Sequence, residues 1–86
     1  MKINGKFFLR KMLGENILIR MDGAKDVPEG VYVLDDVGSF LWEHIEGAAD
    51  AEELAKLLTE EYEIDYGTAF ADVCEFLGKL TSGGLL

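Results

Sequence analysis

The spacing of apolar residues changes along the chain, from short runs to a helical repeat. Residues 7–13 and 17–21 are short β-rich runs, and residues 14–16 between them have a composition typical of a turn, which predicts a hairpin. Residues 22–30 contain the only proline, Pro28, and are predicted to form a loop. Residues 31–34 then predict a third strand, although periodicity alone does not define its pairing partner.

A helical repeat begins after residue 34. Asp35 or Asp36 is expected to cap a first helix that ends at Gly47, because aspartate favours the N-cap and glycine commonly follows a helix. Asp50 is expected to cap a second helix, with Glu53 in the capping-box position. The buried faces of these two helices are predicted to carry Val37, Phe40, Leu41 and Ile45, and then Ala51, Leu54, Ala55, Leu58 and Tyr62.

A third helix is expected between Asp65, as its N-cap, and the glycines at 83–84. Its predicted stripe comprises Tyr66, Phe70, Val73, Leu77 and Leu80, and the whole apolar arc spans roughly 160°, whereas core packing requires about 100°. Two interpretations fit this surplus. Either neighbouring elements cover both borders, or Ala69, Val73 and Phe76 line an apolar groove beside an uncovered strand, where a peptide can add to the sheet edge.

Length and charge narrow the class of protein. The 86 residues predict one domain, residues 1–86, and the single cysteine, Cys74, excludes an internal disulfide. Residues 1–36 carry six basic and six acidic side chains, whereas residues 37–86 carry two and eleven, so the net charge of −9 falls in the second part. Such acidity disfavours a nucleic-acid partner. With neither a signal-peptide core nor an apolar run of about 20 residues, we expect a soluble cytoplasmic protein without a membrane partner.

The sequence offers little catalytic chemistry. His44 is the only histidine and has no cysteine neighbour, and Cys74 lacks the nearby cations typical of a nucleophilic cysteine. The acidic residues at 35–36 and 60–63 are interpreted as helix caps and solvated faces. We therefore predict that the protein is not an enzyme and has no catalytic residue, no metal and no cofactor.

Ser39 leaves a second function open. A serine between an acidic-glycine stretch and an apolar helix is similar to the attachment site of acyl and peptidyl carrier proteins, which carry phosphopantetheine on such a serine. Carrier proteins are helical throughout, whereas the first third of this chain is strand-like, and the Asp-Ser-Leu core of their motif is not present. The carrier protein is therefore an alternative interpretation.

The order of residues after position 33 forms a more specific pattern. It comprises Leu34-Asp35-Asp36-Val37-Gly38-Ser39-Phe40-Leu41-Trp42, Gly47, Ala51-Glu52-Glu53-Leu54, Glu61-Tyr62, Asp72-Val73, Phe76-Leu77, Leu80 and Gly84-Leu85-Leu86. In this order and spacing, about the last 50 residues resemble the PqqD family. This family comprises small peptide chaperones of pyrroloquinoline quinone (PQQ) synthesis and related recognition elements of ribosomal peptide modification.

The resemblance implies an α+β fold, winged-helix-like, with a three-stranded antiparallel sheet followed by three helices. It further implies a non-catalytic chaperone that binds the leader segment of a ribosomally made precursor peptide by strand addition. The chaperone presents the precursor to a modifying enzyme, often a radical SAM protein. By position, the peptide-binding residues are Val31, Tyr32, Val33 and Leu34 on the strand and Ala69, Asp72, Val73 and Phe76 on the helix.

Further expectations follow from this implied site. Asp72 and Glu75 flank the helix face, which predicts a preference for leader peptides that carry Lys or Arg. Exposed strand edges also pair with one another, so a homodimer is possible. A winged-helix module that binds DNA or another protein is the remaining alternative.

Overall fold

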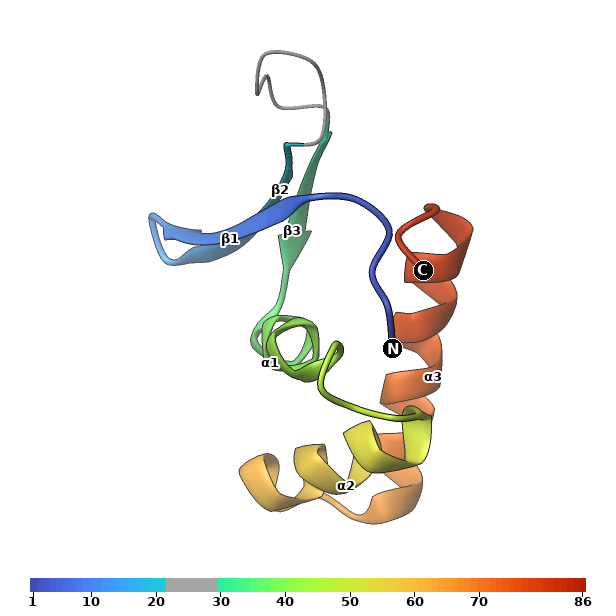
Figure 1. The fold of residues 1–86 in the computed structure, drawn as a ribbon. Helices are drawn as coiled ribbons and strands as arrows, with labels where there is room; N and C mark the ends of the chain where they lie inside the picture. Colours follow the sequence, from blue (N-terminus) through green and yellow to red (C-terminus); the bar gives the residue numbers. More distant parts are fainter. Residues whose placement is uncertain (22–29) are drawn as a thin grey trace. The chain divides into compact units, whose positions relative to one another are not determined.

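The computed structural model describes residues 1–21 and 30–86, in which three strands are followed by three helices (Figure 1). The elements are β1 (Phe7–Met12), β2 (Glu15–Arg20), β3 (Gly30–Leu34), α1 (Asp36–His44), α2 (Ala51–Tyr62) and α3 (Tyr66–Ser82). Two compact units contain them: a sheet unit, Gly5–Ser39, and a helical unit, Met1–Asn4 with Phe40–Leu86. The predicted α+β fold is confirmed. The loop predicted at 22–30 lies, apart from Gly30, outside the described residues.

The sheet is antiparallel throughout, with the strand order β1-β2-β3. The register places Leu9, Leu18 and Tyr32 side by side on one face, and Leu18 is fully buried there. Side chains alternate between the two faces of a strand, so the neighbouring residues point the other way. The second face carries Phe8, Arg10, Met12, Glu15, Ile17, Ile19, Val31 and Val33.

The hairpin turn lies earlier than the sequence predicted. Met12 pairs with Glu15, so the turn is the dipeptide Leu13-Gly14, whose φ angles are 52° and 80°. Positive φ at both central residues is the mark of a type I′ turn, which ordinarily selects Asn-Gly. Leucine seldom takes positive φ, and its apolar side chain led us to include it in the strand. The predicted break at 14–16 is wrong for this reason, and Glu15 belongs to β2.

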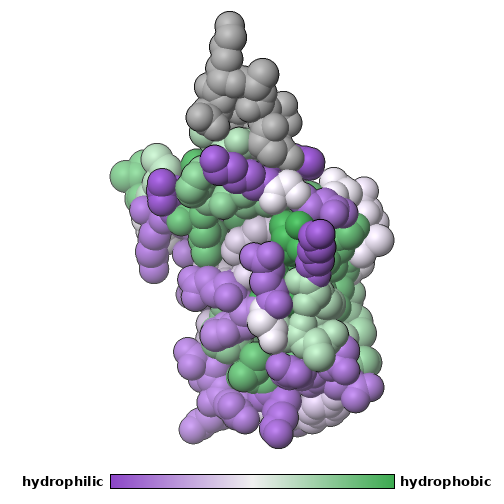
Figure 2. All heavy atoms as spheres, in the orientation of Figure 1, coloured by the Kyte–Doolittle hydropathy of each residue, from purple (hydrophilic) through white to green (hydrophobic). Residues whose placement is uncertain are grey.

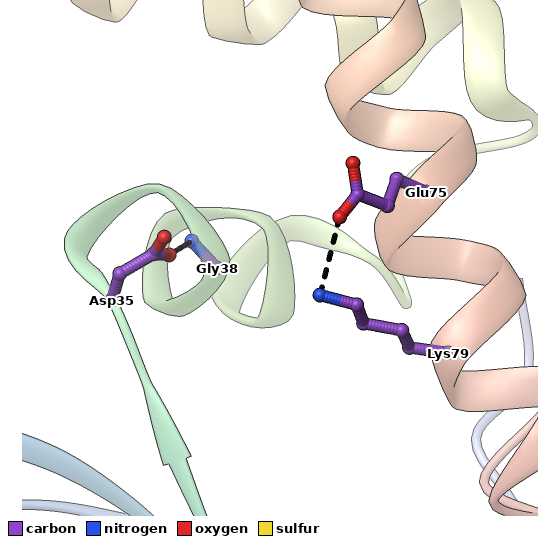
Figure 3. Close-up of polar contacts among 4 residues, drawn as sticks. All are labelled: Asp35, Gly38, Glu75 and Lys79. Atoms are coloured by element: carbon purple, nitrogen blue, oxygen red, sulfur yellow. Dashed lines mark hydrogen bonds and ion pairs between the residues drawn. The ribbon is translucent and has the colours of Figure 1, made fainter.

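Aspartate side chains cap all three helices as predicted. The Asp50 carboxylate accepts a hydrogen bond from the Glu53 N–H at 2.9 Å, and the Asp65 carboxylate accepts one from the Thr68 N–H at 3.0 Å. Asp35 accepts from the Gly38 N–H at 2.7 Å (Figure 3). In each case the carboxylate satisfies an N–H that the first helical turn cannot use.

The helix ends follow the sequence less closely. The third helix stops before Gly83 as expected, and Leu85 folds back, because its N–H donates to the Leu80 carbonyl at 2.8 Å and its side chain is buried. The first helix ends at His44 and not at Gly47, because residues 45–47 form a turn in which the Ala48 N–H bonds back to the Ile45 carbonyl at 3.3 Å.

The helical unit has its own apolar core. Its buried residues come from all three helices, the connection between α1 and α2, and the C-terminal segment: Leu41, Ile45, Ala48, Leu54, Ala55, Leu58, Ala69, Val73, Leu80 and Leu85. The N-terminal segment is tied to this unit, since the Met1 ammonium donates to the Ile45 and Ala48 carbonyls and the Asn4 N–H donates to the Leu85 carbonyl. Tyr62 and Tyr66, which the sequence assigned to buried stripes, are exposed at the ends of their helices.

The cap of α3 generates a prediction about pH. The pKa of Asp65 is lowered from its usual value of 3.8, chiefly because the Thr68 hydroxyl donates to its carboxylate at 2.7 Å, and the Thr68 N–H adds to this effect. Because the pKa of Asp65 is lower in the folded state, its ionised carboxylate stabilises the folded protein. This contribution is complete above the unfolded-state pKa and is lost as pH falls through the folded-state pKa. Thr68→Ala removes the larger cause, so the pKa of Asp65 should rise towards 3.8.

Carboxyl ¹³C titration of Asp65 by NMR measures this change. The matched control is Thr59→Ala, because the Thr59 hydroxyl donates to the Lys56 backbone carbonyl at 2.7 Å and not to a carboxylate. An Asp65 titration curve that is the same in Thr68→Ala and the unmodified protein would contradict the assignment.

Candidate functional site

The strand half of the predicted site lies at an edge of the sheet. β2 occupies one side of β3, and no other strand pairs with β3 among residues 1–21 and 30–86. In an antiparallel ladder, alternate residues direct their N–H and C=O groups towards the partner strand, and those between them point away from it. The second side of β3 therefore presents backbone donors and acceptors that the sheet itself leaves unpaired.

The side chains of β3 form two different rows. Val31 and Val33 are 61% and 63% exposed, whereas Leu34 is half-buried and Tyr32 is at the border of exposure. Because Tyr32 and Leu34 share a face with the buried Leu18, only the valine row points away from that buried side. All four predicted strand residues thus lie in β3, which begins one residue earlier than expected, at Gly30.

Asn16 fixes the end of β3, a role that the sequence analysis missed. Its side-chain amide donates to the Leu34 carbonyl at 3.2 Å and to the Asp36 carboxylate at 3.1 Å. The same side chain thereby holds the last residue of the strand and the first residue of α1. Asparagine is depleted in strands, so the sequence carried no signal for this role, and we had assigned Asn16 to the turn.

The helix half of the predicted site is more buried than expected. Ala69 and Val73 are completely buried in the helical unit, where Leu80 continues the same buried stripe. Phe76 is partly exposed and Asp72 is exposed. Among the predicted helix residues, Phe76 and Asp72 therefore have surface that a ligand can reach directly, and the assignment of all four as peptide contacts stays a prediction.

Two carboxylates, Asp72 and Glu75, lie near Phe76 in the sequence of α3, and Glu75 is paired with a lysine. Glu75, which the sequence analysis placed beside Asp72, forms an ion pair with Lys79 at 3.2 Å on an exposed surface of α3 (Figure 3). Its charge is therefore offset locally, although exposed pairs of this kind stabilise a helix only slightly. Asp72 is the exposed carboxylate of the predicted set.

The described residues offer neither a metal cluster nor an accessible attachment serine. No group of three or more His, Cys, Asp or Glu side chains gathers in the described ranges in a way that could hold a metal ion. Ser39 is 9% exposed, and its N–H donates to the Asp35 carbonyl at 2.9 Å. A serine that accepts a prosthetic arm needs a reachable hydroxyl, so this burial disfavours the carrier-protein interpretation. The helices of the described segments are too short or too polar to cross a membrane.

Comparison with solved structures finds the same fold in two protein–peptide complexes. TbiB1 in complex with the TbiA(beta) leader peptide is 28% identical, with a TM-score of 0.73 over 100% of this chain and 94% of that chain. A lasso peptide synthetase B1 complexed with the leader peptide is 18% identical, with a TM-score of 0.72 over 98% of this chain and 93% of that chain. The curated proteins contain no match.

Comparison with family models settles the relationship that the residues after position 33 suggested. Residues 15–86 match the family described as Coenzyme PQQ synthesis protein D (PqqD). The matched segment begins at the first residue of β2 and includes β3 and all three helices, so it extends well beyond the motifs from which the resemblance was recognised. The chain belongs to the PqqD family.

Proposed function

We propose that this protein binds the leader segment of a ribosomally made precursor peptide and presents the precursor to a modifying enzyme. The observation that carries the proposal is the second edge of β3, which the sheet leaves unpaired. Membership of the PqqD family and the likeness to TbiB1, a protein solved with a leader peptide, support it. The comparisons favour neither a carrier protein nor a DNA-binding winged helix.

Recognition begins with the backbone. An extended leader segment aligned with β3 completes the ladder, and each hydrogen bond contributes about 0.5–1.5 kcal/mol net. These bonds do not depend on the side chains of the leader, so they supply affinity without selecting a sequence. Alternate leader side chains then lie beside the row of Val31 and Val33 or beside the row of Tyr32 and Leu34. Selection comes from these rows.

The α3 residues are proposed to add to this selection. Phe76 supplies apolar contact surface, and Asp72 favours a leader with a nearby Lys or Arg. Ala69 and Val73 are buried, so a peptide contacts them only if it replaces the groups that cover them in the free chain. We retain them as proposed peptide-binding residues on this condition.

The proposed interaction involves one non-catalytic domain and a recipient enzyme in the cytosol. The sheet unit and the helical unit act as one recognition domain, residues 1–86, without a catalytic step or a cofactor of their own. Binding takes place in the cytosol, where ribosomes make the precursor, and the recipient is a modifying enzyme such as a radical SAM protein. Pairing of two β3 edges in a homodimer would compete with the leader for the same hydrogen bonds.

Substitution on α3 tests the proposed contact. Phe76→Asp should weaken binding of the leader peptide at least about tenfold, because the carboxylate loses hydration when the peptide covers it. Fluorescence anisotropy with the labelled leader of a candidate precursor measures the affinity. Phe76 is preferred to Val73 as the test position, because a charge at the fully buried Val73 would unfold the helical unit.

Ala71→Asp is the matched control, since it introduces the same charge at an exposed position of the same helix. It should bind the leader within about twofold of the unmodified protein. Equal affinities for Phe76→Asp and Ala71→Asp, with both variants folded by circular dichroism, would remove Phe76 from the site. Absence of leader binding by the unmodified protein would refute the proposed function itself.

The charge of Asp72 generates a second prediction. For a leader with Lys or Arg, Asp72→Asn should weaken binding by about two- to fivefold at low salt, and the difference should shrink as salt screens the interaction. Titrations at several salt concentrations measure it, with Asp50→Asn on α2 as a control that removes the same charge while keeping a good N-cap. A difference that is independent of salt would argue against direct charge pairing.

A further inference from the structure

The second face of the sheet is apolar and exposed. An exposed face of an antiparallel sheet is ordinarily polar, whereas here Phe8, Val31 and Val33 are all exposed and alternate with half-buried isoleucines of β2. The buried Leu18 lies on the opposite face, so this one is not the core side of the sheet. We call it the outer face; its apolar residues are Phe8, Met12, Ile17, Ile19, Val31 and Val33, and two charged residues, Arg10 and Glu15, lie on the same face.

The hairpin tip extends this apolar surface. Leu13 is completely exposed and has a φ of 52°, in a turn position where asparagine is the common choice. Leucine is therefore unfavourable there both for the backbone and for the exposed side chain. Its neighbour Met12 is exposed as well. Figure 2 shows apolar residues, in green, gathered over the end of the β1–β2 hairpin, with hydrophilic residues, in purple, beside them.

The charge around the outer face differs from that of the rest of the chain. Lys6 and Arg10 lie over the Phe8 ring, with Nζ and Cζ at 5.7 and 5.3 Å from its centroid. By the register, Lys11 and Arg20 lie on the opposite face with Leu18, whereas Glu15 lies on the outer face, so the two basic side chains near Phe8 outnumber one carboxylate there, in a chain whose net charge is −9. A partner that fits this surface needs an apolar patch with carboxylates at its rim.

We propose that the outer face and the hairpin tip dock the modifying enzyme, through an enzyme surface with an apolar centre and an acidic rim. This inference rests on the proposed function. Val31 and Val33 belong both to the edge strand and to the outer face, so a leader added to β3 makes the outer face broader and continuous with the bound peptide. An enzyme seated there is directly beside its substrate.

The same observations argue against a second copy as the occupant. Two outer faces related by a twofold axis bring together two surfaces on each of which Lys6 and Arg10 outnumber Glu15, so they carry net charge of the same sign. The leader itself is accommodated by the edge of β3 and does not require Leu13 or Phe8. The hairpin tip therefore serves a surface that lies beyond the leader.

The variant Leu13→Asn with Phe8→Thr tests the proposal without touching β3. Asparagine suits the positive φ of the turn and threonine suits a strand, so the variant should stay folded, and Leu13→Asn alone should raise Tm. The probes are the labelled leader of a candidate precursor and the purified enzyme that modifies this precursor. The variant should bind the leader within about twofold of the unmodified protein and the enzyme at least about tenfold more weakly. Surface plasmon resonance measures enzyme binding, and anisotropy measures leader binding.

Tyr66→Ser is the matched control, since it removes an exposed apolar side chain of α3 and should leave enzyme binding unchanged. Enzyme affinity should also fall with Arg10→Glu and with added salt. The proposal is overturned if the outer-face variant binds the enzyme normally, or if the unmodified protein does not bind it. Two further outcomes would overturn it. Loss of self-association alone, measured by sedimentation, would make a second copy the occupant, and loss of binding to anionic vesicles alone would make a lipid surface the occupant.

The two proposals fail separately. If the unmodified protein binds the enzyme but no leader, the proposed function is wrong and the docking surface stands. If it binds the leader but no enzyme, the docking surface is wrong and the proposed function stands.

Discussion

The account depends on one constraint, which is that backbone N–H and C=O groups need hydrogen-bond partners, whether from another strand, a side chain or water. β2 satisfies one edge of β3, and the strand order β1-β2-β3 gives the other no partner strand within the described part of the chain. Proteins usually protect such edges with charges, proline or short strands. Here the edge carries the exposed valines 31 and 33, which are among the best strand formers. An edge of this kind is suited to accept an extended peptide.

The parts of the fold that local interactions define could be predicted from the sequence. A cap depends on residues three positions apart, so the bonds from Asp50 to Glu53 and from Asp65 to Thr68 were readable from the sequence. The stop of α3 at 83–84 was likewise readable, because glycines end helices. The motifs after position 33 identified the PqqD family, which the match over residues 15–86 confirms.

The parts that depend on distant contacts could not be predicted in the same way. Strand order and register follow from the position of the hairpin turn, and Leu13 concealed that position because leucine is atypical of positive φ. Without the register, Phe8, Ile19 and Val31 could not be placed on one face, so the outer face was missed. Burial on α3 was equally hidden, since an apolar stripe does not show which of its residues a neighbour covers. Ala69 and Val73 are covered, and Phe76 is only partly so.

Hydrogen–deuterium exchange of the β3 backbone, with and without the leader peptide of a candidate precursor, tests the central claim most directly. In the free protein, the amides of residues 30–34 that face β2 should exchange slowly and the alternate ones quickly. Bound leader should slow the fast set, because the added strand accepts their hydrogen bonds. The account would be contradicted if the amides that point away from β2 were already protected in the free protein. It would also be contradicted if they still exchanged quickly with the leader bound.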